Sequence, residues 1–261
     1  AQSAYHVLED SIYQGLNETS GDTIHMQFDA DSLDQIDVLG GTQGTFTPGR
    51  YNTSADTTVF YESDEIRFLV PERITNLRYN AQTRYQDMEL TAAFIDVFWN
   101  ENLLVATPLP DSADTTNVTR NYPTFKQQGK EPMIGRKLEY NLRTQRGRVL
   151  RGETEFDDGR YLGRRIMKEG ENTLYVRSGE YTTCELKNPH YHFQSRKMKL
   201  ILKDKVIARP IVLYIHGVPI FGLPFGVFPQ KGGRRSSGYI MPSYGESARD
   251  GRYLRGLGYF W

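Results

Sequence analysis

The sequence predicts an all-β protein, and three observations support this class. Short runs of alternating apolar and polar residues, rich in β-branched and aromatic side chains, recur at a spacing of roughly 8–12 residues. The 24 glycines and 12 prolines fall largely between these runs, where turns are expected. Few windows keep the apolar stripe of a helix over three turns, residues 87–98 being the one fair exception. Together these features favour a sandwich, a jelly roll or a stacked β-architecture.

The expected strands form two series, preceded by a polar lead and separated by a proline-rich segment. Residues 1–57 carry only scattered apolar side chains, which predicts a loosely ordered lead or edge strands. The first series is expected at residues 59–61, 66–68, 77–81, 89–95 and 103–106. Residues 107–136 hold four prolines and predict a long loop or insertion. The second series is expected at residues 137–142, 149–154, 174–176, 180–183, 190–193, 198–202 and 207–215.

The last part of the chain has a different composition. Residues 211–228 are strongly apolar, but glycines and prolines interrupt them too often for a spanning helix. Residues 239–261 alternate aromatic residues with glycine and stop in mid-pattern, which is typical of the opening strands of an outer-membrane barrel. We therefore expect three regions: a lead over 1–57, a β-domain over 58–229, and a linker with the first barrel strands over 230–261.

The charges are balanced overall but divided along the chain. Lys and Arg number 32 and Asp and Glu number 32. Residues 1–120 hold 6 Arg, no Lys and 19 acids, whereas residues 121–261 hold 26 bases and 13 acids. The bases of the second half are spread singly and form no run of five or more, so a nucleic-acid partner is disfavoured. A nucleophile elbow, a P-loop, Rossmann glycines and an HExxH motif are all missing from the sequence, and no catalytic residue is expected.

Apolar side chains recur on one face of many expected strands. Such a face is ordinarily a closed core, but an open-edged sandwich would present it as a slot for acyl chains, with charges at its rim. The residues themselves leave both interpretations open. The candidate lipid-binding residues are Ile66, Phe68, Leu77, Tyr79, Leu138, Tyr140, Leu174, Val176, Tyr191, Phe193, Leu200 and Leu202.

An enzymatic alternative rests on histidines and acids of the second half. His190 and His192 would share one face of a strand, as the ligands of cupin-type metal sites do, although a metal needs a third and usually a fourth ligand. Glu153 and Glu155 are candidate acids for glycoside chemistry. The alternative is thus a carbohydrate-active or cupin-like metal-dependent jelly-roll enzyme. Cys184 is the single cysteine, so it is either a free thiol or pairs with a cysteine outside these 261 residues.

Six short segments, taken together in order and spacing, resemble the LptD/OstA family of lipopolysaccharide-assembly proteins. The resemblance extends over about residues 58–261 and is closest to homologues from Bacteroidota. The segments are GRKLEYNLRTQRG at 135–147, GEYTTC at 179–184, NPHY at 188–191, GVP at 217–219, LPFGVFP at 223–229 and SGYIMPSYGE at 237–246.

The resemblance implies a fold, a transport function and a set of partners. It implies a periplasmic β-jelly-roll of the OstA type, an open V-shaped sandwich, followed by an outer-membrane barrel. In the family, the apolar interior of the jelly-roll accepts the acyl chains of lipopolysaccharide from a periplasmic bridge protein of similar fold (LptA-like) and passes them to the barrel. A lipoprotein that plugs the barrel (LptE-like) is a further implied partner, whereas no cofactor, metal or enzymatic activity is implied. Cys184 matches the family cysteine that forms a disulfide with the barrel, and the expected location is the outer membrane with this domain in the periplasm.

Overall fold

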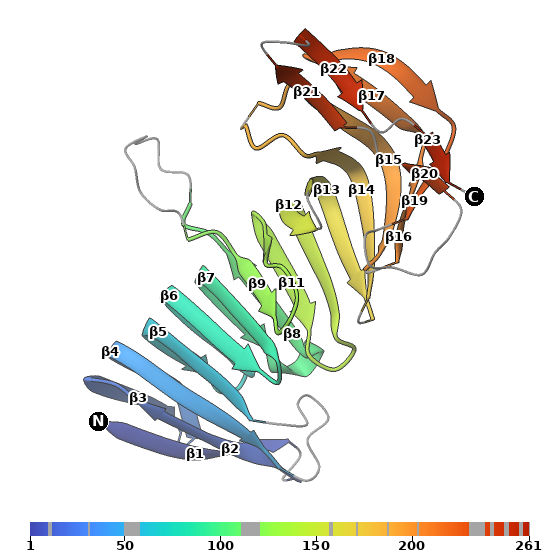
Figure 1. Ribbon diagram of the computed structural model, residues 1–261. Helices are drawn as coiled ribbons and strands as arrows, with labels where there is room; N and C mark the ends of the chain where they lie inside the picture. Colours follow the sequence, from blue (N-terminus) through green and yellow to red (C-terminus); the bar gives the residue numbers. More distant parts are fainter. Residues whose placement is uncertain are drawn as a thin grey trace. The chain divides into compact units, whose positions relative to one another are not determined.

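The computed structural model consists almost entirely of antiparallel β-strands (Figure 1). It describes residues 1–9, 12–30, 32–49, 58–110, 121–156, 159–170, 172–186, 188–202, 204–229, 238–240, 243–247, 251–255 and 258–260. Within these residues there is no α-helix, so the predicted all-β class is confirmed. No described helix has the length and apolar character needed to cross a membrane. Residues 87–98, whose pattern was ambiguous, form strand β7 (Met88–Phe98).

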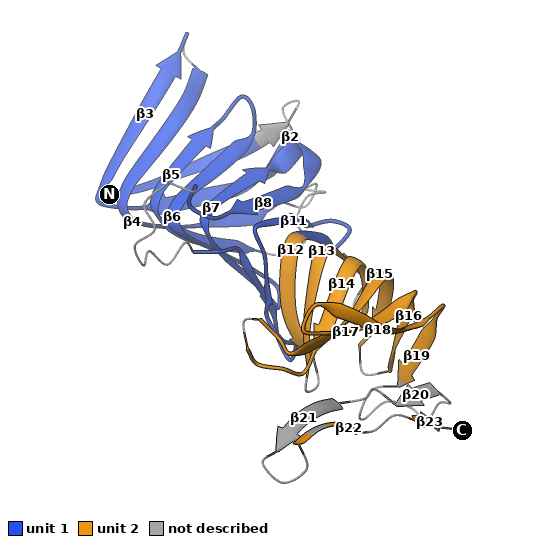
Figure 2. Cartoon of the chain, turned by 90° about the horizontal axis from the view of Figure 1, so that it is seen from above, with its two compact units in different colours: residues 1–149 blue, residues 150–261 orange. Residues whose placement is uncertain are grey.

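The chain divides into two compact units, residues 1–149 and 150–261 (Figure 2). Unit 1 contains β1 (Gln2–Glu9), β2 (Ile12–Ser20), β3 (Thr23–Asp29), β4 (Ser32–Pro48), β5 (Val59–Leu69), β6 (Ile74–Tyr85), β7, the 3₁₀ turn η1 (Trp99–Glu101), β8 (Leu103–Thr107), β9 (Thr124–Gln127), β10 (Met133–Ile134) and β11 (Lys137–Asn141). Strand β12 (Arg146–Phe156) begins in unit 1 and continues into unit 2.

The first 57 residues contribute four strands to unit 1. Strand β4 pairs with β3 along residues 32–39, with β2 along residues 43–48, and with β5 from Gln35 opposite Leu69 to Phe46 opposite Val59. Ile36, Val38 and Phe46 are buried, which gives this polar stretch an apolar anchor. The described part of the lead is therefore built into the same sheet as β5, and a domain boundary at residue 57 stays a prediction.

The long strands of unit 1 bend in the middle, and each contributes one arm to each of two layers. In β5 and β6, residues 59–62 pair with 82–85, whereas residues 65–69 pair with 74–78, with an irregularity between the two arms. A bulge bends a strand and increases its twist. The ring of Tyr61 on the first arm lies 6.1 Å from that of Phe68 on the second, so the two layers face each other across the core.

Unit 2 contains the remaining strands and repeats this design. Its strands are β13 (Gly159–Glu169), β14 (Thr173–Thr182), β15 (Tyr191–Ile201), β16 (Lys205–Arg209), β17 (Ile211–Ile215), β18 (Val218–Leu223), β19 (Gly226–Pro229), β20 (Gly238–Ile240), β21 (Ser243–Ser247), β22 (Gly251–Arg255) and β23 (Gly258–Phe260). In β13 and β14, Gly163 pairs with Gly179 and Arg165 with Arg177, which leaves Arg164 and Ser178 unpaired at the bend.

Small residues occupy the inner side of this bend because there is no room for a larger side chain. A Cβ atom on Gly163 would lie 2.6 Å from Cγ1 of Val176 and 2.9 Å from Cγ1 of Ile166. A Cβ atom on Gly179 would lie 2.8 Å from the same Val176 atom. The first arm of β15 pairs with β17 and its second arm with β16. Unit 2 is therefore also a pair of facing layers joined by continuous strands.

Strands β20–β23 form two separate antiparallel pairs, β20 with β23 and β21 with β22. They occupy the region expected to be a linker and the first barrel strands. That assignment stays a prediction.

Candidate functional site

The apolar face predicted from the sequence lies largely inside the two units. In unit 1 the buried members are Ile66, Phe68, Leu77, Leu138 and Tyr140, and in unit 2 they are Leu174, Val176, Tyr191, Phe193 and Leu200. Cross-strand register brings several of them together, since Ile66 lies opposite Leu77 and Leu174 lies opposite Leu200. Period-two alternation therefore assigned the inward direction of these ten residues correctly. That they bind lipid remains a prediction.

Two of the twelve predicted residues are not buried. Tyr79 is 46% exposed, because Tyr79 and Asn80 form the irregularity between the two arms of β6, where both have positive φ, 61° and 50°. Inward alternation resumes at Ala81. Its ring instead packs edge-on against Phe94 at 5.4 Å. Leu202 follows the end of β15 and is only half-buried. The expectation that Tyr79 faces inward was wrong, and Leu202 lies at the margin of the core.

The facing layers of unit 1 meet through aromatic side chains. Phe46 of the first layer lies 4.7 Å from the ring of Trp99, and Phe125 of β9 lies 5.4 Å from the ring of Tyr140 on β11. Phe125 and Tyr140 are both buried. At these two places, aromatic rings occupy the space between the layers where acyl chains were expected.

A buried polar cluster lies at the β1–β5 end of unit 1, and sequence reasoning missed it. The Asn17 side-chain amide donates a hydrogen bond to the Tyr5 hydroxyl at 2.8 Å, and the Tyr61 hydroxyl donates one to the Asn17 carbonyl oxygen. The Tyr61 ring crosses β4 over Gly44, where a Cβ atom would lie 2.5 Å from the ring. Burial raises the pKa of Tyr5 to about 12 and that of Tyr61 well above its usual value. Both phenols therefore stay neutral to a higher pH than an exposed tyrosine would, which keeps their hydroxyl protons available for hydrogen bonds.

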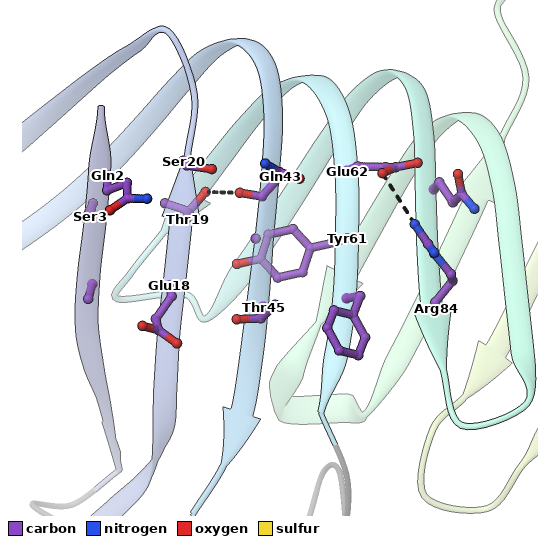
Figure 3. Close-up of a pocket in the computed structure, with 14 residues that line it drawn as sticks. Gln2, Ser3, Glu18, Thr19, Ser20, Gln43, Thr45, Tyr61, Glu62 and Arg84 are labelled. Carbon is purple, nitrogen blue, oxygen red and sulfur yellow. Dashed lines mark hydrogen bonds and ion pairs between the residues drawn. The ribbon is translucent and has the colours of Figure 1, made fainter.

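Beside this cluster, strands β1, β2, β4, β5 and β6 line a hollow of about 520 Å³ (Figure 3). Polar residues such as Glu18, Thr19 and Gln43 share its lining with the rings of Phe60 and Tyr61, and Arg84 forms an ion pair with Glu62 at 3.5 Å. The Thr19 hydroxyl donates to the Gln43 carbonyl at 3.2 Å. This mixed lining differs from the mostly apolar cavity that was expected for acyl chains.

Cys184 lies in the turn between β14 and β15 and is half-buried. Its backbone N–H donates to the Thr182 hydroxyl at 3.0 Å, and this hydroxyl donates to the Tyr191 carbonyl at 2.7 Å. The sulfur lies 3.8 Å from Nδ1 of His190. The turn is thus fixed from inside by a buried threonine, whereas the thiol beside His190 is partly accessible.

The residues of the enzymatic alternative are not brought together. His192 stacks on Tyr214 at 5.0 Å with nearly parallel rings, whereas His190 lies beside His216 at 5.5 Å. Glu153 forms an ion pair with Arg160 at 3.4 Å. Over the part of the chain that the structure describes, no group of three or more His, Cys, Asp and Glu side chains is arranged to hold a metal ion.

The fold and this interior define the class of protein. Both units are antiparallel β-structures whose bent strands enclose an apolar interior between two layers, which is consistent with a jelly-roll architecture.

Comparison with known proteins gives the more particular assignment. Residues 206–261 match the family model described as LptD protein. The LPS-assembly protein LptD of Nitrosospira multiformis is 30% identical over 131 residues, covering 49% of this chain and 14% of that protein. Proteins of the same description from Haemophilus influenzae and Burkholderia cenocepacia are 29% and 33% identical over 126 and 87 residues. These matches cover 46% and 33% of this chain, and 15% and 11% of the relatives.

The resemblance to LptD proteins that the six sequence motifs predicted is thereby confirmed over the matched parts. The chain spans less than a fifth of the length of these relatives.

Proposed function

We propose that this chain is a non-enzymatic part of a system that transports lipopolysaccharide and inserts it into the outer membrane. The observation that carries the proposal is the apolar interior between facing β-layers in a chain similar to proteins named for lipopolysaccharide assembly. We propose that the chain lies on the periplasmic side of the outer membrane. No arrangement in the described residues favours the metal-dependent alternative.

The proposed mechanism is the passage of acyl chains between the two layers. Moving a chain of about twelve methylenes out of water stabilises it by roughly 10 kcal/mol. That gain must offset the packing energy that facing side chains such as Phe125 and Tyr140 give up when they separate. The layers are joined on one side by the strand bends, so separation at the opposite side is the least costly opening.

The proposed partners follow from exposed strand edges and from Cys184. Strand β1 is the first strand of the row in Figure 1, with β2 beside it, and its outer edge can accept a strand from a bridge protein of similar fold. We propose that the partly accessible Cys184 forms a disulfide with a cysteine outside these residues, in the membrane part of the same protein. A plug lipoprotein is a further proposed partner of that membrane part.

Site-specific photo-crosslinking tests the proposed lipid path. A photoreactive amino acid is placed at the buried positions Leu138, Tyr140, Phe193 and Leu200 and, as matched outward controls, at Lys137 and Glu139, which flank Leu138 on β11. The chain is then exposed to lipopolysaccharide, and circular dichroism checks that each variant is folded.

Crosslinks confined to the inward positions are the expected result. Equal labelling of inward and outward positions, or no labelling of folded variants, would show that the interior is a closed core and that the fold is shared without the transport function.

A further inference from the structure

Four basic residues of unit 2 stand in one row across neighbouring strands. Arg165 of β13 lies opposite Arg177 of β14, Arg177 lies opposite Lys197 of β15, and Lys197 lies opposite Arg209 of β16. All four side chains are exposed. We call this row the cation ridge. Strands lie about 4.8 Å apart, so the ridge extends over roughly 14 Å.

The ridge has no electrostatic compensation from the described residues. None of its four side chains forms an ion pair or a side-chain hydrogen bond with them. Like charges directly opposite each other destabilise a sheet. Arg164 and Arg196 add two exposed cations at the unpaired bend positions beside the ridge, and the acid on the adjoining outward row is Glu180. Repulsion between these cations destabilises the folded domain when nothing anionic is bound. A row of this kind is therefore expected where an anionic surface covers it.

The row next to the ridge is apolar and aromatic. Met167, Tyr175, Lys199 and Ile207 face one another across the same four strands. Met167 is 41% and Tyr175 is 36% exposed, and the Lys199 ammonium lies 5.5 Å from the centre of the Tyr175 ring. Tyrosine and methionine beside basic residues suit the boundary between lipid headgroups and acyl chains. A soluble polyanion would make no use of these apolar side chains.

We propose that the cation ridge and its apolar row dock unit 2 onto the surface of a bilayer that contains anionic lipids. Basic residues near such a surface are attracted to its negative potential. The proposal does not depend on lipopolysaccharide transport, because the ridge lies on the outer side of the strands, whereas the proposed lipid path lies between the layers.

The test is vesicle flotation of the purified chain with phosphatidylcholine vesicles that contain or lack phosphatidylglycerol. The ridge variant combines Arg165→Gln, Arg177→Gln, Lys197→Gln and Arg209→Gln. The control removes four exposed cations of unit 1 and so has the same net charge: Arg67→Gln, Arg84→Gln, Lys126→Gln and Arg143→Gln. Thermal unfolding of both variants shows whether they are folded, and relief of repulsion predicts that the ridge variant is at least as stable as the unaltered chain.

The unaltered chain and the control are expected to float with the anionic vesicles, and salt should weaken both. Each base near an anionic surface strengthens binding about fivefold, so the loss of all four should weaken binding by up to ~600-fold. Equal binding by the ridge variant and the control would overturn the proposal. A second variant, Met167→Ser with Tyr175→Ser, is compared on vesicles and on soluble polyphosphate. If this variant binds more weakly to vesicles but not to polyphosphate, the result supports a membrane as the partner of the ridge. If vesicle binding is unchanged and polyphosphate binds tightly, the partner is a soluble polyanion and the proposal is wrong.

Discussion

We expect that only glycine fits at position 163, on the inner side of the bend in unit 2. The added methyl of Gly163→Ala would meet Val176 at 2.6 Å and Ile166 at 2.9 Å, both shorter than any normal carbon contact. Overpacking of this kind costs about 1–3 kcal/mol, whereas loss of glycine flexibility in the unfolded chain returns about 0.4–1 kcal/mol. We expect a net loss of ~1–2 kcal/mol in the free energy of unfolding.

A double-mutant cycle isolates this clash. Val176→Ala removes the methyl that Gly163→Ala would touch, so the double variant should lose less stability than the two single losses added together. Urea unfolding followed by circular dichroism measures the four free energies. Gly222→Ala serves as the control, because its nearest neighbour would lie at 3.6 Å. Strict additivity, or an equal loss at Gly222, would refute the view that the bend is closed by contact between Gly163 and Val176.

Two further predictions concern buried hydroxyl groups. Burial raises the pKa of Tyr5 to about 12, whereas the pKa in the unfolded chain is about 10. The neutral phenol therefore contributes its full stabilisation below pH ~10. This contribution, some 3 kcal/mol in all, is lost as the pH rises from about 10 to about 12. Urea midpoints between about pH 8 and pH 11 should therefore fall less steeply in Tyr5→Phe, and identical slopes would contradict the pKa assignment. Thr182→Val leaves the Cys184 N–H without its acceptor and should lower the free energy of unfolding by ~1–3 kcal/mol. Thr182→Ser keeps the hydroxyl, so its stability should stay near that of the unaltered chain. Equal losses for the two variants in a thermal melt would show that packing, and not the hydroxyl, stabilises this turn.

Alternation predicted the strand faces wherever a strand runs without a bulge. Leu138 and Tyr140 on β11, and Leu174 and Val176 on the part of β14 that precedes the bend, are buried as expected. In an uninterrupted strand, successive side chains point to opposite faces, so the face of one residue determines the face of every other residue. The inward residues were therefore readable from the sequence up to the first irregularity in each strand.

Bulges account for what alternation failed to predict. In β7, Ala92 and Ala93 are both buried, which brings Leu90, Ala93 and Val97 into the spacing of an amphipathic helix. This is why residues 87–98 also fitted a helical pattern. In β6 an equivalent bulge turns Tyr79 outward. A one-residue insertion leaves no mark in the sequence when ordinary residues form it, so its position has to come from the register of the neighbouring strands.

The polar cluster at the β1–β5 end was unpredictable for a different reason. Asn17 and Thr42 are buried, although their chemistry is that of surface residues. Burial of such groups is tolerated only when they have hydrogen-bond partners, and here the partners come from strands far apart in the sequence, such as Tyr61 for Asn17 and Ser63 for Thr42. The low apolar content of residues 1–57 therefore suggested a loosely ordered lead or edge strands, and the described residues of this segment form β1–β4.

The bend of the strands separates two chemistries in unit 2. On its inner side, Gly163 and Gly179 allow the layers to converge, and the buried side chains beyond them are mainly apolar, with Lys168 as a polar exception. On its outer side, the same strands present the cation ridge, including Arg165 and Arg177. A lipid held between the layers would enter from the side opposite the bend, so its charged headgroup would lie away from the ridge. The bases of the ridge thus need a different anionic partner from the lipid that the interior is proposed to carry, and the excess of positive charge after residue 120 is not in itself a sign of headgroup binding.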